Sequence, residues 1–335
     1  FWELHREWLA QHGIWYPPGP LRPDPATKIS TGTGDWLFAA VARGEPWDRF
    51  LDQISGAPSD IDVLIRSELL AYAEPPAVAE LRRQLAAVGF HLHPFYLVRN
   101  PDEWYLSAYQ QHVKRNAYVE PFPTFCRIYP LEFQLALDHF ESVLGEGAVR
   151  LLSYEAGKAD VVGYVLRHAL GIAAAPPAFA NPTINRSLTS FELEWLRATN
   201  AAHLATGLSH EEARLRGTRL SDSLIALRPT IPAAAKYREA MPADVADRLI
   251  PVVESLNQRL PAGPIRIVRA QGSDALSDEQ LATARCLAEV MAREREFAAP
   301  QQPTVRRSWY RPVRAALRSM AHAARGRRTT AVGPQ

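Results

Sequence analysis

Short apolar runs alternate with stretches of helical spacing in the first half of this chain, and this alternation restricts the folds that it can adopt. The apolar runs cover residues 61–65, 95–98 and 149–152, and helical spacing follows them over 77–88, 101–114 and 161–170. Strands that alternate with helices predict a parallel sheet covered on both faces, which is the α/β class. Ligands of such sheets bind beyond the carboxyl ends of the strands. The residues after Ile65, Val98 and Leu152 are therefore the first candidates for a site.

The second half of the chain has a different pattern. Helical spacing dominates over residues 191–203, 211–215, 233–239 and 243–260, with one short strand expected at 265–268 and a capping box at Ser277 and Gln280 before a last helix. We therefore predict an α/β core at 1–180, a helical portion packed on it at 181–297, and a loosely ordered tail at 298–335. The tail is basic, because residues 306–328 include eight arginines and no acidic residue.

Composition excludes several classes of protein. A chain of 335 residues with 47% hydrophobic residues can bury a large core, and it has no apolar run long enough to span a bilayer and no signal-peptide pattern at its start. Cys126 and Cys286 are its only cysteines, which argues against a disulfide framework and a cysteine metal site and favours the cytoplasm. A net charge of +2 gives no reason to expect a nucleic-acid partner. We expect no metal cofactor.

Arg99 and Ser107 form the most specific pattern in the chain. Arg99 directly follows the apolar run 95–98, and Ser107 lies eight residues later on the predicted helix. A guanidinium at a strand end and a hydroxyl on the next helix would point into one crevice, where they suit a phosphate monoester. The alternative is an arginine paired with a carboxylate and a serine that faces solvent.

The string from Tyr96 to Tyr109, YLVRNPDEWYLSAY, is similar to the motif of sulfotransferases that use 3′-phosphoadenosine-5′-phosphosulfate (PAPS). In that family the arginine and the serine hold the 3′-phosphate of the nucleotide, so the resemblance implies this role for Arg99 and Ser107. The segment 149–171, with Tyr154 and Glu155 at a turn, resembles the family's next strand, turn and helix, where these two residues are expected to be structural.

A third segment, Asn-Arg-Ser-Leu at 185–188, looks like one seen in bacterial carbohydrate-type sulfotransferases. Because basic residues of the family's late loop can reach the nucleotide phosphates, the resemblance implies that Arg186 is a second phosphate ligand. The alternative is a solvated loop arginine. The implied fold is the three-layer parallel sheet of the P-loop nucleotide-binding type.

The family's phosphate loop, Lys-[Ser/Thr]-Gly-Thr-Thr, is not found where the resemblance places it. The helical start at Phe1 and the segment 13–17 resemble the elements that follow that loop, so we expect that the first strand and the loop are missing and that this chain alone is inactive. The segment 28–35, KISTGTGD, superficially resembles the loop, but it follows prolines and not a strand. We interpret it as a connection.

Glu68 is the candidate general base for sulfuryl transfer. It follows the apolar run 61–65, where the family places its base in some branches, and it would take the proton of the acceptor hydroxyl. Two alternatives stay open: a carboxylate stabilised at a helix start, or a base in the missing segment. Arg66 departs from the serine common at that position in bacterial relatives. His91, His93 and His112 are expected to be structural or solvated.

The resemblance implies transfer of a sulfuryl group from PAPS to a hydroxyl acceptor, with a glycan or glycoconjugate as the expected class. One alternative is a P-loop kinase or another nucleotide-binding protein, which would need a Walker sequence and an acidic magnesium ligand. The other is an inactive module of the same fold that binds a partner, with the basic tail contacting an anionic membrane.

Overall fold

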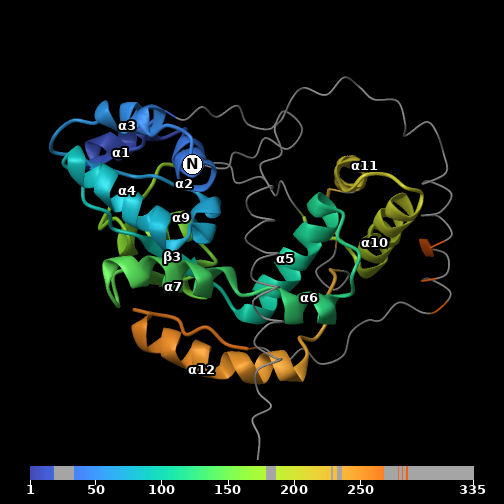
Figure 1. Cartoon of the computed structure of the whole chain (residues 1–335). Coiled ribbons are helices and arrows are strands. Elements are labelled where there is room, and N and C mark those ends of the chain that lie inside the picture. Colours follow the sequence, from blue (N-terminus) through green and yellow to red (C-terminus); the bar gives the residue numbers. More distant parts are fainter. Residues whose placement is uncertain are drawn as a thin grey trace, which may run out of the picture.

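Short parallel strands form the sheets of this protein in a computed structural model (Figure 1). β1 (Ile14–Trp15) pairs with β2 (Asp62–Val63), and β3 (Phe95–Val98) pairs with β4 (Arg150–Ser153). The structure describes residues 1–18, 34–178, 186–227, 229–231 and 236–267, together with 278, 281, 284 and 285. Within these residues the parallel strands and their helices confirm the α/β class, and the strands form two two-stranded sheets.

The β3–β4 pair is covered on both of its faces. Phe95 and Leu97 pack with Leu152 against α9, while Val98 and Leu151 belong to the large cluster built on α5 and α7. This division follows from the strand geometry, because successive side chains point to opposite faces and the register places residue 97 beside residue 152. The carboxyl ends of both strands therefore reach the same edge between two helical layers.

The helices of the first half have the following bounds: α1 (Arg6–Gln11), α2 (Asp35–Arg43), α3 (Asp48–Ser55), the 3₁₀ helix η1 (Glu68–Tyr72), α4 (Pro75–Ala87), α5 (Pro101–Asn116), α6 (Phe122–Ile128), α7 (Glu132–Leu144), α8 (Tyr154–Gly157) and α9 (Val161–His168). The predicted helices after the three apolar runs are confirmed. Asp160 caps α9 by accepting a hydrogen bond from the Gly163 amide at 2.8 Å, and Gly171 follows with φ +71°. The pattern analysis missed α3, α6 and α7, although Phe133, Leu137 and Phe140 give α7 a clear apolar face.

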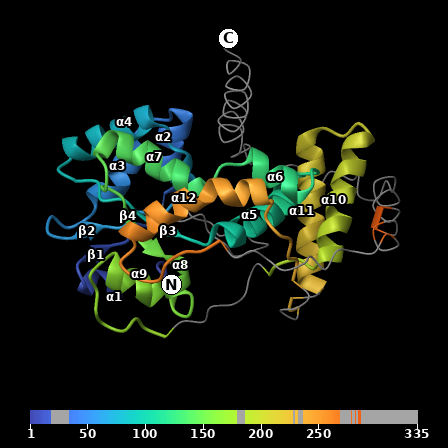
Figure 2. The ribbon, with the colours of Figure 1, turned by 90° about the horizontal axis from the view of Figure 1, so that it is seen from below.

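In the part of the second half that the structure describes, the long helices are α10 (Ser190–Ala205), α11 (His210–Leu227) and α12 (Ala243–Arg259). Figure 2 shows α10 and α11 beside α5, with α12 running from the strand region toward α6. One hydrophobic cluster joins α5, α6 and α7 to all three.

Two elements predicted for the second half are wrong in the residues that the structure describes. A helix was expected at 233–239, but Lys236 forms an antiparallel bridge with Thr189 and residues 237–239 are extended or irregular. Residues 265–267 form no strand, because Asn257 and Asn100 satisfy the backbone amides of Ile265 and Arg266. The capping box at Ser277, the tail 298–335 and the segment 28–33 lie outside the described residues. Among the described helices, none has the length and hydropathy needed to cross a bilayer.

Candidate functional site at the strand ends

Arg99 lies where β3 ends and α5 begins, one residue before the helix N-cap Asn100. Its Nη2 donates to Oε2 of Glu103 at 3.2 Å, and its Cζ lies 5.0 Å from the centre of the Tyr154 ring. Tyr154 directly follows β4, so the cation–π contact joins the carboxyl ends of the two neighbouring strands. The Arg99 side chain is 32% exposed. It is therefore held in place and still accessible to a ligand.

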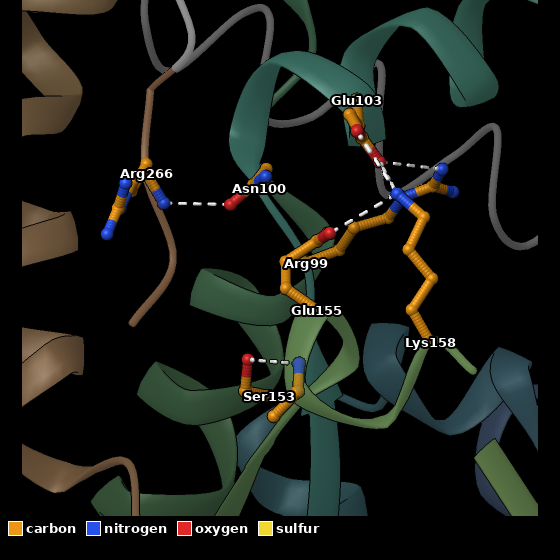
Figure 3. A network of polar contacts seen from close by, with 8 residues as sticks. Arg99, Asn100, Glu103, Ser153, Glu155, Lys158 and Arg266 are labelled. Carbon is orange, nitrogen blue, oxygen red and sulfur yellow. Dashed lines mark hydrogen bonds and ion pairs between the residues drawn. The ribbon is translucent and has the colours of Figure 1, made fainter. Parts of the chain in front are cut away.

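Lys158 completes a charged cluster above these strand ends (Figure 3). Its Nζ lies 3.4 Å from a carboxylate oxygen of Glu103 and 3.4 Å from one of Glu155. Partial burial opposes the charge on Lys158, but the two carboxylates raise its pKa above the ordinary value. Arg99, Lys158, Glu103 and Glu155 together carry no net charge. We call these four residues the strand-end cluster.

Two buried polar atoms of the strand-end cluster make no hydrogen bond with the described residues. They are Nε of Arg99 and Oε1 of Glu155. A buried donor or acceptor without a partner costs about 1–3 kcal/mol, so such atoms mark places where a further polar group is accommodated. Nε of Arg99 is thus a donor whose hydrogen bond the described residues do not satisfy.

A distant segment of the chain lies against the base of the strand-end cluster. The backbone amide of Arg266 donates to Oδ1 of Asn100 at 2.8 Å. A Cβ on Gly263 would lie only 2.5 Å from Cβ of Ala156, and Gly263 has φ +67°, so only glycine suits this close approach. Residues 263–266 therefore lie beside the ends of both β3 and β4.

Ser107 lies on the same face of α5 as Glu103, because residues four apart are neighbours along a helix. It is exposed, and its hydroxyl bonds to none of the described residues. Glu103 and Ser107 are separated by about 6 Å along the helix axis. Arg99 bonds to Glu103, and Glu103 is one helical turn before Ser107, so Glu103 separates the two predicted phosphate ligands along the chain.

Arg186 does not join the strand-end cluster. It is 4% exposed and forms two hydrogen bonds with the Glu192 carboxylate, both at 2.8 Å, and it also donates to the carbonyl of Leu224. Burial alone would raise the pKa of Glu192, but the Arg186 hydrogen bonds bring it below the ordinary value. This burial contradicts the alternative of a solvated loop arginine, and it places the guanidinium on Glu192 and not at the strand-end cluster, so the phosphate-binding role stays a prediction. Arg186 joins the start of α10 to α11.

Glu68 belongs to a second group of polar residues, on the α7 side of β3. It is exposed at the start of η1, and its charge acts on Glu132, the first residue of α7. Glu132 accepts hydrogen bonds from Tyr96 and Tyr72. Burial and then the charge of Glu68 raise the pKa of Glu132 to about 7, against the lowering effect of the two tyrosines. A second carboxyl group, that of Glu132, therefore lies within electrostatic reach of Glu68, where the sequence indicated one carboxyl group.

Stability should depend on the proton of Glu132. Because burial raises its pKa from 4.5 to about 7, the folded protein holds a proton that the unfolded chain releases in that range. The native state binds more protons there, so the free energy of unfolding falls as pH rises from about 4.5 to about 7, by at most about 3 kcal/mol from this group. Urea unfolding at intervals across this window should show a smaller decrease in Glu132→Gln. An identical decrease in both proteins would contradict the assignment.

The histidines and one groove lie apart from the strand-end cluster. His91 and His93 are exposed, and His112 packs against the rings of Phe125 and Tyr129. An open groove of about 300 Å³ lies between α6 and α12, lined by apolar residues together with Arg127 and Arg248. Tyr105 lines this groove from the buried face of α5. Ser107 is exposed and is not one of the lining residues, so the groove is separate from the predicted phosphate site.

Three parts of the site at the strand ends were not predicted from the sequence: Lys158, residues 263–266 and Glu103. Lys158 and residues 263–266 carry no local signal, because only the tertiary fold brings them to Arg99. Glu103 could have been found, since it lies four residues after Arg99 and that spacing favours an ion pair. The described residues include no group of three or more side chains suited to a metal ion. Comparisons of the chain with protein-family models, curated proteins and solved structures give no match.

Proposed function

We propose that this chain is a sulfotransferase-like protein that takes PAPS as donor and a glycan or glycoconjugate hydroxyl as acceptor. The observation that carries the proposal is the position of Arg99 at the carboxyl end of β3, with an unsatisfied buried Nε and with Ser107 on the following helix. Edges of this kind are where parallel sheets bind ligands. The string from Tyr96 to Tyr109, which resembles the family motif, supplies the remaining support.

The fold proposed with this function is the three-layer parallel sheet of the P-loop nucleotide-binding type. The support for it is local: β3 and β4 are parallel, and helices cover both faces of the pair. In this arrangement Arg99 and Ser107 bind the 3′-phosphate, and the guanidinium fork supplies paired donors to two phosphate oxygens. The Tyr154 ring keeps the fork oriented.

The proposed reaction moves one SO₃ group. The acceptor oxygen forms a new bond to sulfur, the bond between sulfur and the 5′-phosphate oxygen breaks with its electron pair leaving on the phosphate, and the acceptor proton passes to a base. The products are a sulfate ester and adenosine 3′,5′-bisphosphate. Glu68 stays the proposed base because of its place after β2, at the start of η1, where the family resemblance puts the base of some branches.

The proposal is tested by comparing two nucleotides, one with and one without a 3′-phosphate. Calorimetric titration of the chain should show that adenosine 3′,5′-bisphosphate binds at least about tenfold more tightly than adenosine 5′-monophosphate, since charged hydrogen bonds contribute about 1.5–3 kcal/mol. Binding is the better readout here than turnover, because Arg99 and Ser107 are assigned to the 3′-phosphate and not to the reacting group. Equal affinities for the two nucleotides would overturn the proposal.

A further inference from the structure

The Glu103 carboxylate occupies the position beside the Arg99 guanidinium that a phosphate bound by Arg99 would take. Glu103 lies one helical turn before Ser107 on α5, and its Oε2 accepts a hydrogen bond from Nη2 of Arg99 at 3.2 Å. Its two oxygens also meet Nζ of Lys158, each at 3.4 Å (Figure 3). A carboxylate in contact with two cations presents the same kind of oxygen acceptors as a phosphate.

We propose that Glu103 is a built-in competitor of the 3′-phosphate, and that Lys158 is a further phosphate-binding residue that is released when Glu103 leaves. This inference rests on the proposed function and extends it to two residues that the sequence did not indicate.

Charge explains why Glu103 must leave. The strand-end cluster has two cations and two carboxylates, so it presents no net attraction to a phosphate dianion. When Glu103 turns away, Arg99 and Lys158 face the ligand with only Glu155 beside them. The net positive charge of the remaining three residues then suits a phosphate. Arg99 and Lys158 each exchange the Glu103 carboxylate for the phosphate.

Glu103 is able to leave because its place is not enclosed. Its side chain is 33% exposed, and it lies in the first turn of α5, where the helix dipole favours a carboxylate whichever way the side chain turns. Ion pairs of such exposure are weak, so exchange with a ligand phosphate is feasible.

Glu155 keeps Lys158 at the site when Glu103 turns away. Its Oε2 lies 3.4 Å from Nζ of Lys158, and its side chain is only 18% exposed. Glu155 comes from α8, directly after β4, so this pair fixes the ammonium group to the strand end and not to α5. Lys158 thus stays beside Arg99 in either state, with Glu103 as the moving member.

The test compares binding of adenosine 3′,5′-bisphosphate by calorimetry at one salt concentration. We expect Glu103→Gln, which removes the charge and keeps the shape, to tighten binding about three- to tenfold, and Lys158→Met, which keeps the aliphatic stem, to weaken it by a similar factor. Glu80→Gln is the matched control, because Glu80 forms an exposed ion pair with Arg83 on α4. The control should bind like the wild-type chain.

The outcomes separate this inference from the proposed function. If the wild-type chain prefers the bisphosphate but Glu103→Gln binds it equally or more weakly, the competitor role is wrong and the proposed function stands. Unchanged binding by Lys158→Met likewise removes Lys158 from the site. A wild-type chain without preference for the bisphosphate overturns both. Urea unfolding of each variant confirms that the compared proteins are folded.

Discussion

Replacing Arg99 with alanine should weaken binding of adenosine 3′,5′-bisphosphate by at least about tenfold, and by up to about a hundredfold. The substitution removes the guanidinium fork and its contact with the Tyr154 ring, and it leaves Glu103 with Lys158 as its remaining partner in the cluster. The affinity of Arg99→Lys should lie between those of the wild-type chain and Arg99→Ala. An ammonium group keeps the positive charge but loses the paired donors of the guanidinium. Calorimetric titration at constant salt measures all three proteins.

Arg150→Ala is the matched control for Arg99→Ala. Arg150 is an exposed arginine at the amino end of β4, where it donates to the carbonyls of His168 and Ala169. It lies on the same pair of strands but at the opposite edge, so its loss should leave the binding constant unchanged. If Arg99→Ala binds the bisphosphate as well as the control does, the phosphate site is not at this strand end.

The largest effect on stability is expected for Arg186→Ala. The substitution leaves the Glu192 carboxylate largely buried without its arginine and removes the donor to the Leu224 carbonyl. Removing one partner of a buried ion pair typically costs about 3–5 kcal/mol. Urea unfolding should therefore show a large fall in the midpoint with little change in the slope.

The double variant Arg186→Met/Glu192→Leu tests whether the loss of stability in Arg186→Ala comes from the unpaired charge of Glu192 or from lost packing. Because it removes both charges and keeps apolar volume, it should recover much of the lost stability. The affinity of the folded protein for adenosine 3′,5′-bisphosphate should be unchanged in both variants. A stable Arg186→Ala protein with weakened nucleotide binding would restore the role that the sequence indicated.

Local pattern predicted the unit from β3 to α5 because its determinants are close in sequence. The apolar run 95–98, the proline at the first position of α5 and the helical spacing after it all lie within one short segment. The same locality placed Arg99 at the strand end and Ser107 on the helix.

Arg186 shows where local pattern fails. Its partner Glu192 lies only six residues away, in a capping box with Thr189 that begins α10. The capping box is readable in the sequence, but the burial that makes the arginine structural comes from α11, through Leu224. A basic residue in a loop-like segment gives no sign of that packing.

The strand-end cluster likewise depends on tertiary contacts. Glu103 is four residues from Arg99, but Lys158 approaches from beyond β4 and meets Glu103 only in the folded chain. The pairing of Glu132 with Tyr96 and Tyr72 brings together three elements in the same way. Residue type indicates that such side chains can titrate or bind, whereas packing decides which of them meet.

The hydrogen bond from Arg266 to Asn100 closes a loop of 166 residues. Contacts between residues so far apart in sequence carry the entropy of closing the whole segment from α5 to α12. We therefore expect the start of α5 to reach its final geometry only after α12 has docked. Newly synthesised chains would then acquire a competent strand-end cluster only once α12 is in place, so ligand binding at this edge would report that the segment from α5 to α12 has been assembled.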